Sequence, residues 1–134
     1  NAEIRKASIF KLPFKDNEVD GIYNLGVMEH FSKEEIDKIL KEFNRVIKKG
    51  GKIVLFWPPV FGLSVIALHI IHFIMKYVLK NKNKLHPEEP NKLKSKKLAF
   101  ELLSSNGFIP KEWSFSIKDF FTYVVLVGEK SIKK

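Results

Sequence analysis

Hydrophobic and polar residues alternate along this chain in blocks that predict strands and helices in turn. Residues 19–25 (VDGIYNL) and 53–57 (IVLFW) are nearly continuous apolar runs. Such runs are typical of strands that are covered on both faces of a parallel sheet. Residues 3–10 precede a Leu-Pro-Phe turn and predict a further short strand.

The stretch that follows Ser32 predicts an amphipathic helix. Ser32 and Glu35 have the spacing of a capping box, in which each side chain bonds the backbone amide of the other residue. Apolar residues then recur every three or four positions, as on one helix face: Ile36, Ile39, Leu40, Phe43, Val46 and Ile47. Lys48 and Lys49 suit the negative end of the helix dipole, and Gly50 is expected to be the left-handed cap.

The C-terminal part predicts one more helix and a hairpin. Residues 94–106 form the expected helix, with Gly107 as its stop and with these residues inward: Leu98, Ala99, Leu102 and Leu103. Residues 113–117 and 120–127 follow as strands joined around residues 118–119, a connection short enough for an antiparallel hairpin. Strands separated by helices indicate an α/β fold with an open, mainly parallel sheet.

Between these parts lies an unusually apolar stretch, since no charged residue occurs from Ile53 to Met75. Pro58-Pro59 interrupts it and leaves residues 60–75. As a helix these residues would reach about 24 Å, which is shorter than the hydrocarbon core of about 30 Å. The sequence therefore favours a cap over an apolar pocket or an in-plane membrane contact over a spanning helix.

Composition and charge exclude some kinds of functional site and leave others open. The 134 residues suffice for a single domain, and the absence of cysteine excludes disulfide scaffolds, Cys-type zinc sites, iron–sulfur ligation and thiol catalysis. Of the net charge of +9, residues 76–97 contribute +6, from eight lysines against two glutamates. This basic segment is either a solvated loop or a contact for an anionic surface. The chain begins at Asn1 with no signal peptide, which suggests a piece of a longer protein and a cytoplasmic location.

The order and spacing of the motifs resemble the class I S-adenosylmethionine-dependent methyltransferases. The likeness lies in LPFKDNEVDGIYNLGVMEHF, the capped helix, NRVIKKGGKIVLFWPP and the terminal hairpin, and it is strongest to the small-molecule branch typified by ubiquinone/menaquinone-biosynthesis enzymes. It covers residues 1–59 and 94–129. Residues 1–134 are then a single partial methyltransferase domain, with an apolar and basic insertion at about 60–93.

The resemblance implies a Rossmann-like sheet that is incomplete at the N-terminal side and ends in an antiparallel hairpin. It also implies S-adenosylmethionine as the cofactor. The family's Gly-rich cofactor turn, and the acid that holds the ribose, have no counterpart in this chain. We therefore expect the chain to be the C-terminal part of the domain, to bind cofactor weakly or not at all alone, and to be inactive by itself.

The resemblance also places cofactor contacts. Ser8 and Ile9 correspond to the family's Asp-Ala pair at the adenine, with Ser8 in place of the usual carboxylate. Asn24, Leu25 and Gly26 correspond to residues that line the methionine end of the cofactor. They lie where strands of open α/β sheets end and ligands bind.

The acceptor side involves three further residues. Glu29 and His30 match the family's Glu-His pair, and His30 is the candidate catalytic residue that orients the nucleophile or takes its proton. The alternative interpretations are a structural His30 that packs under the pocket and a Glu29 that serves as a helix N-terminal charge. Trp57 is expected to line the acceptor site, or else to belong to the hydrophobic core.

No metal site is expected. His69 and His72 are three positions apart and His86 follows, but no carboxylate or thiol stands beside them at ligand spacing.

The leading hypothesis is direct methyl transfer to a small, apolar or lipid-like acceptor, with peripheral membrane contact through residues 60–84. The alternatives are an RNA methyltransferase or RNA-binding module, suggested by the net charge, and a non-catalytic remnant that needs an upstream segment. Nucleic acid is the less favoured partner, because the aromatic residues are not interleaved with the lysines. The sequence gives no oligomeric state.

Overall fold

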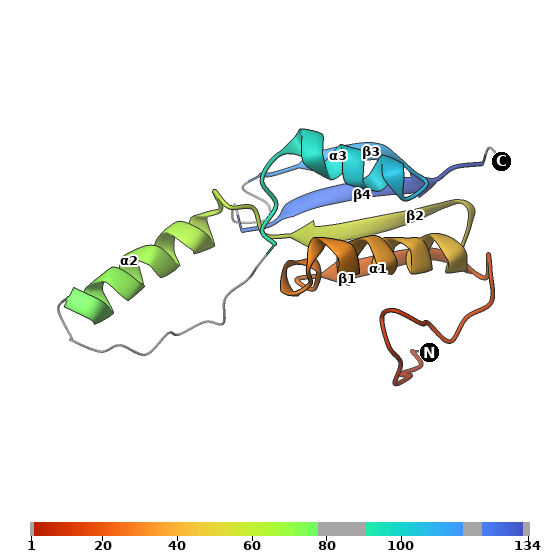
Figure 1. The fold of residues 1–134 in the computed structure, drawn as a ribbon, viewed down its shortest axis with the longest axis horizontal. Coiled ribbons are helices and arrows are strands. Elements are labelled where there is room, and N and C mark those ends of the chain that lie inside the picture. Colours follow the sequence, from red (N-terminus) through yellow and green to blue (C-terminus); the bar gives the residue numbers. More distant parts are fainter. Residues whose placement is uncertain (1, 78–90, 117–121, 133–134) are drawn as a thin grey trace.

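A computed structural model describes residues 2–77, 91–116 and 122–132 (Figure 1). Its elements in chain order are β1 (Val19–Leu25), the 3-10 helix η1 (Met28–His30), α1 (Lys33–Val46), β2 (Ile47–Trp57), α2 (Leu63–Tyr77), α3 (Lys96–Ser105), β3 (Phe108–Ser114) and β4 (Val124–Lys130). The four strands form one sheet in the order β1-β2-β4-β3. β1 is parallel to β2, while β4 is antiparallel to both β2 and β3. The predicted α/β class and the terminal hairpin are confirmed, whereas among the described strands only β1 and β2 form a parallel pair.

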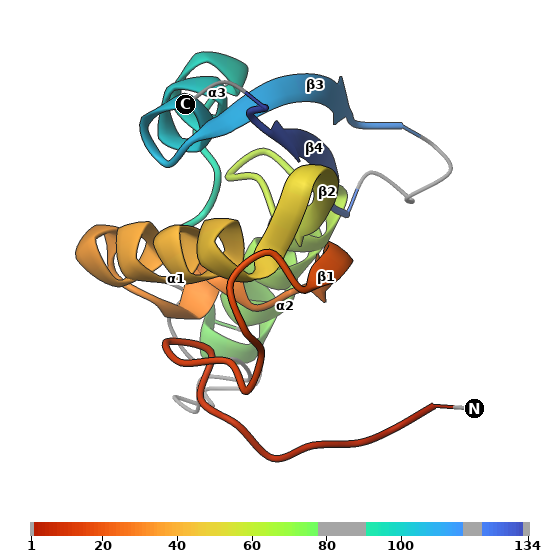
Figure 2. The same cartoon turned by 90° about the vertical axis from the view of Figure 1, so that its right-hand side faces the viewer.

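Both α1 and α3 cover the same face of the sheet (Figures 1 and 2). The core between them contains fully buried side chains from α1, α3, β2 and β4: Ile39, Leu40, Leu103, Ile53, Leu55 and Leu126. On the opposite face Tyr23, Leu25 and Ile109 are 64%, 51% and 45% exposed. The bounds of the predicted strand at 19–25 are confirmed, but the expectation that it is covered on both faces is wrong within the described residues.

The strand expected at residues 3–10 does not form. Residues 2–7 are irregular, and Ser8 pairs only with Lys11 in an isolated bridge. A strand requires a hydrogen-bonding neighbour, and no strand of the described residues pairs with this segment. The N-terminal segment is instead held against α1 by Glu42, which accepts from the Leu12 amide at 2.7 Å.

The capping box at the start of α1 is confirmed. The hydroxyl of Ser32 accepts from the Glu35 amide at 3.3 Å, and the carboxylate of Glu35 accepts from the Ser32 amide at 2.8 Å. The predicted end of the helix is wrong, because α1 ends at Val46 and Lys48, Lys49 and Gly50 belong to β2. Gly50 does have a left-handed conformation, with φ of +76°, but as an irregular residue within β2.

Lys130 takes the place of the expected lysine cap on α1. Its Nζ donates to the carbonyl of Asn44 at 2.5 Å and to that of Ile47 at 2.8 Å. Partial burial of this ammonium lowers the pKa of Lys130. The cation that satisfies the last carbonyls of α1 thus comes from β4, far along the chain.

The C-terminal helix is close to its prediction. Gly107 follows α3 with φ of +80°, as expected for a helix stop. Ala99 and Leu103 are fully buried as predicted, but Leu98 is 51% exposed and was wrongly placed inward. The hairpin strands are β3 and β4 rather than residues 113–117 and 120–127, because strand pairing begins at Phe108. The expected turn at 118–119 lies outside the described residues.

The apolar stretch after Pro59 forms α2, which extends away from the sheet (Figure 1). Its exposed side chains do not cap a pocket at the sheet edge. Within the described part of the chain, no helix has both the length and the apolar character needed to cross a bilayer.

Candidate functional site

The site predicted from the sequence lies where β1 ends. Asn24 is 8% exposed, and its Oδ1 has no hydrogen-bond partner among the described residues. Leu25 points to the other face and is 51% exposed. Gly26 then turns the chain out of the sheet with φ of +63°, while its amide donates to the Phe56 carbonyl at 3.0 Å. A buried acceptor atom without a partner therefore lies near the edge at which open α/β sheets bind ligands.

Gly26 leaves space that two polar side chains approach. A Cβ atom at this position would lie 3.3 Å from Oε1 of Glu29 and 3.4 Å from the hydroxyl of Tyr123. Tyr123 was missed by the sequence analysis, although a signal existed. It directly precedes β4, and an antiparallel strand starts at the edge where its parallel neighbours end.

Glu29 and His30 form a pair with unequal exposure. Nε2 of His30 lies 3.9 Å from Oε1 of Glu29, with the Glu29 side chain 5% exposed and the His30 side chain 47% exposed. Both residues belong to η1, and Glu29 lies in the first turn of this short helix rather than of α1. An accessible imidazole thus lies beside a buried carboxyl group.

Trp57 and Asn91 hold this turn in place. Trp57 is 3% exposed, and its Nε1 donates to the Asn91 carbonyl at 2.7 Å. The Asn91 amide donates to the Glu29 carbonyl at 3.3 Å, and its side-chain amide donates to the Phe31 carbonyl. Asn91 was also missed by the sequence analysis, because nothing local to it indicates a contact with a turn so far away in the chain.

The predicted adenine contacts lie beside the same turn. Ser8 and Ile9 form a tight turn in which the Ser8 hydroxyl accepts from the Phe10 amide at 3.3 Å. The ring of Phe10 meets that of Phe31 edge-on, with centroids 5.5 Å apart. The structure thus brings the turn at residues 8–9 close to the segment that follows β1, even though the expected strand is absent.

These residues fit one part of a nucleoside cofactor. The unpartnered Oδ1 of Asn24 can accept from an ammonium group, and the left-handed turn at Gly26 lets a ligand approach the backbone. Among the described residues, no three His, Asp or Glu side chains are grouped to hold a metal ion. The side chains of His69 and His72 and the whole of His86 lie outside what the structure describes.

Comparison with known proteins bears on the sequence family and on the fold. Residues 1–55 match the family described as methyltransferase domain. The solved structure of a SAM-dependent methyltransferase from Methanosarcina mazei superposes with a TM-score of 0.65 at 18% identity, covering 99% of this chain and 69% of that one. This chain has the Rossmann-like methyltransferase fold.

Two further methyltransferases resemble part of this chain or match it over part of their own length, one in fold and one in sequence. Magnesium protoporphyrin IX methyltransferase from Synechocystis PCC 6803, solved with bound SAH, gives a TM-score of 0.61 at 18% identity, covering 93% of this chain and 49% of that one. A probable tRNA methyltransferase 9B from Mus musculus is 36% identical over 55 residues, which are 40% of this chain and 12% of that protein. The chain therefore spans only a small part of the curated relatives it matches.

Proposed function

We propose that this chain forms part of an active site that transfers a methyl group from S-adenosylmethionine to a small, apolar or lipid-like acceptor. The observation that carries the proposal is the convergence of Asn24, Gly26, Glu29 and Tyr123 at the carboxyl end of β1. The methyltransferase-domain match and the methyltransferase fold support it.

In this proposal the cofactor spans two groups of residues. Asn24, Leu25 and Gly26 hold its methionine end, with Oδ1 of Asn24 accepting from the ammonium group. Ser8 and Ile9 contact the adenine. When bound, the cofactor supplies an activated methyl group on a sulfonium, which an aligned nucleophile can accept directly.

The remaining residues act on the acceptor. His30 takes the proton that the acceptor loses, and Glu29 lies beside it, with Oε1 3.9 Å from Nε2 of the imidazole. Trp57 is too deeply buried to be the main acceptor wall. It contributes by fixing Asn91, which holds η1 and thereby positions Glu29.

We further infer that the chain is one partial domain with an insertion at about 60–93. Support comes from the contact between the two ends of that segment. Pro59 forms a parallel bridge with Leu93, and the Val60 amide donates to the Leu93 carbonyl at 3.1 Å. The chain thus leaves and re-enters the fold at one point, as an inserted segment would.

A small acceptor is favoured by the resemblance to the ubiquinone/menaquinone branch and by structural neighbours such as the protoporphyrin enzyme. RNA is the second candidate acceptor, because the mouse relative is named as a probable tRNA methyltransferase and the chain carries a net charge of +9.

The test is an NMR titration of the isotope-labelled protein, which detects weak binding. S-adenosylhomocysteine is expected to shift the amide signals of Ser8, Ile9, Asn24 and Gly26. 5′-Methylthioadenosine lacks the amino-acid portion and is expected to shift only the signals of Ser8 and Ile9. The variant Asn24→Ala should lose the shifts that S-adenosylhomocysteine causes. Asn44→Ala, near the C-terminal end of α1, should retain them. If S-adenosylhomocysteine shifts the signals of other residues and leaves those of Ser8, Ile9, Asn24 and Gly26 in place, the cofactor site is wrong.

A further inference from the structure

Helix α2 presents an apolar face that the rest of the fold leaves uncovered. Ile66, Ile70, Phe73, Ile74 and Tyr77 follow the spacing i, i+4, i+7, i+8 and i+11, which places them on one side of the helix. Their exposed fractions run from 44% to 62%. Figure 1 shows the helix projecting from the sheet rather than packing on it. An exposed apolar surface of this extent marks an interaction site.

The apolar face continues to the foot of the helix. Val60 and Phe61 precede α2 and are 45% and 46% exposed. Of these two, Phe61 touches the fold through its ring, which meets that of Phe115 edge-on at 5.3 Å. The uncovered surface therefore runs from the sheet edge along the described length of α2.

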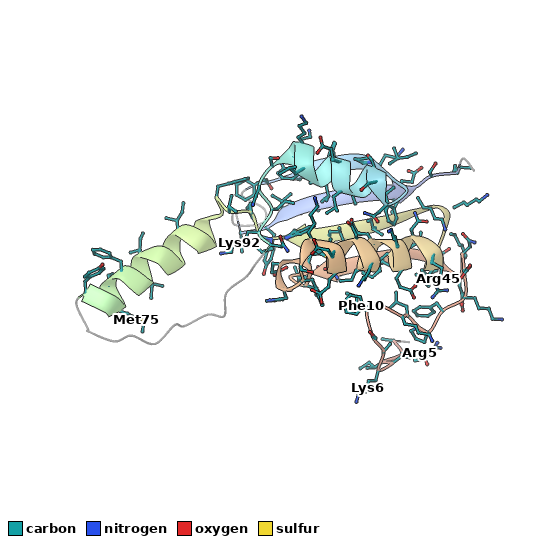
Figure 3. All side chains as sticks on the ribbon, viewed as in Figure 1. Arg5, Lys6, Phe10, Arg45, Met75 and Lys92 are labelled. Carbon is teal, nitrogen blue, oxygen red and sulfur yellow. The ribbon has the colours of Figure 1, made fainter. Side chains whose placement is uncertain are left out.

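Exposed lysines adjoin this foot. Val60 is hydrogen-bonded to Leu93, so the segment that contains Lys92 and Lys94 lies beside the start of α2 (Figure 3). Lys94, Lys96 and Lys97 are exposed. Together with the rest of residues 76–97, these lysines give that segment a net charge of +6.

We propose that α2 and the adjoining lysines form a docking surface for an anionic lipid bilayer, with α2 lying in the plane of the interface. The apolar side chains would enter the boundary between headgroups and acyl chains, and the lysines would meet lipid phosphates. The 15 residues of α2 cover about 22 Å, which suits this orientation better than a crossing of a core about 30 Å thick. The proposal does not depend on the proposed methyl transfer.

Two features favour a bilayer over other partners. An apolar helix face offers RNA few phosphate contacts. A second copy of this chain would bring the same lysines together, which repel each other. A bilayer with anionic lipids matches both the apolar and the basic part of the surface. Tyr77, at the far end of α2 and 61% exposed, suits the headgroup level.

The first test is flotation of the protein with vesicles of phosphatidylcholine containing about one third phosphatidylglycerol, against vesicles of phosphatidylcholine alone. Binding is expected to the anionic vesicles, with a decrease at high salt because salt screens the lysines. The double variant Ile70→Asp, Phe73→Asp should lose at least tenfold in binding. The matched control Ile4→Asp, Ile132→Asp changes exposed residues away from α2, which are 98% and 66% exposed, and should bind as the wild type does.

A second measurement guards against misfolded variants. The chain contains no cysteine, so Ile70→Cys can be labelled at a single site with a polarity-sensitive fluorophore, and Ile132→Cys serves as its control. The label at position 70 should shift to the blue with anionic vesicles, and the label at position 132 should not. No flotation with anionic vesicles, equal loss in the control double variant, or a blue shift caused by self-association without lipid would overturn the proposal. Binding to an RNA oligonucleotide in place of vesicles would overturn it as well.

Discussion

The indole Nε1 of Trp57 donates to the backbone carbonyl of Asn91 at 2.7 Å, and this bond joins the end of β2 to the turn that carries Glu29 and His30. The contact spans residues far apart in the chain. It links the stability of the sheet edge to the geometry of the candidate site, because Asn91 also bonds the carbonyl groups of Glu29 and Phe31.

Replacing Trp57 should therefore destabilise the fold and loosen η1. Trp57→Phe removes the buried donor, leaves the Asn91 carbonyl without it and opens a small cavity, and we expect a loss of about 1–3 kcal/mol in the free energy of unfolding. Urea denaturation followed by circular dichroism measures this loss. Trp113→Phe, at a half-buried site on β3, should cost less. Equal costs for the two variants would contradict a special role for Trp57.

Alanine at Gly26 should disturb the site more than alanine at a matched glycine. Gly26 and Gly50 both have positive φ, +63° and +76°, so either substitution should cost about 1–2 kcal/mol in backbone strain. The new Cβ meets Glu29 and Tyr123 in Gly26→Ala, whereas at Gly50 its nearest neighbour is the flexible end of Ile132 at 3.9 Å.

NMR spectra of the two glycine variants separate strain from crowding. Gly26→Ala should shift the side-chain signals of Tyr123 and His30 and weaken the response to S-adenosylhomocysteine. Gly50→Ala should leave these signals in place. If Gly26→Ala changes only stability, the proposed convergence around Gly26 is wrong.

Stability should fall in acid partly through Glu42. Its carboxylate accepts from the Arg45 guanidinium at 2.7 and 2.9 Å and from the Leu12 amide at 2.7 Å, and the bond from Arg45 is the main cause of its lowered pKa. Figure 3 shows Arg45 on the side of α1 toward the N-terminal segment. A lowered pKa in the folded state gives stability that is present above the unfolded value of about 4.3 and is lost as the pH falls through the folded value.

Glu42→Gln removes this titration, so the free energy of unfolding should depend less steeply on pH below about 4.3. Urea denaturation across this acid range measures the slope. Glu112→Gln, an exposed site on β3, serves as the charge-matched control. The assignment to Glu42 fails if both variants keep the slope of the wild type.

Removing the N-cap of α1 should weaken a helix that buries five apolar side chains. Ser32→Ala deletes the hydroxyl that accepts from the Glu35 amide, at an expected cost of about 1 kcal/mol. It should also raise the pKa of Glu35 toward its ordinary value, because bonds from the Ser32 amide and hydroxyl lower that pKa in the intact box. Ser104→Ala, an exposed position within α3, should be neutral or slightly stabilising, since alanine is the better helix former. Thermal unfolding of both variants tests the difference.

Short-range patterns in the sequence were sufficient to predict several helices and strands, or one of their ends. The apolar run at 19–25 predicted β1, the Ser32–Glu35 spacing predicted the start of α1, and Gly107 predicted the end of α3. Each of these features has a local cause: a run of apolar residues, a hydroxyl at the start of a helix, or a glycine with positive φ. The interactions that determine them lie within a few residues in the chain.

Only the tertiary structure decided which segments that are distant in the chain contact each other. Residues 3–10 have a strand-like pattern but no neighbouring strand to bond, so they remain irregular. Asn91 contacts Trp57 and η1 across a long separation that no local pattern indicates, and Tyr123 reaches Gly26 through the pairing of β4 with β2. The same holds for α2, whose apolar composition fits a buried helix as well as an exposed one. Packing against distant segments determines all of these features, and a one-dimensional pattern specifies the character of a face but not its partner.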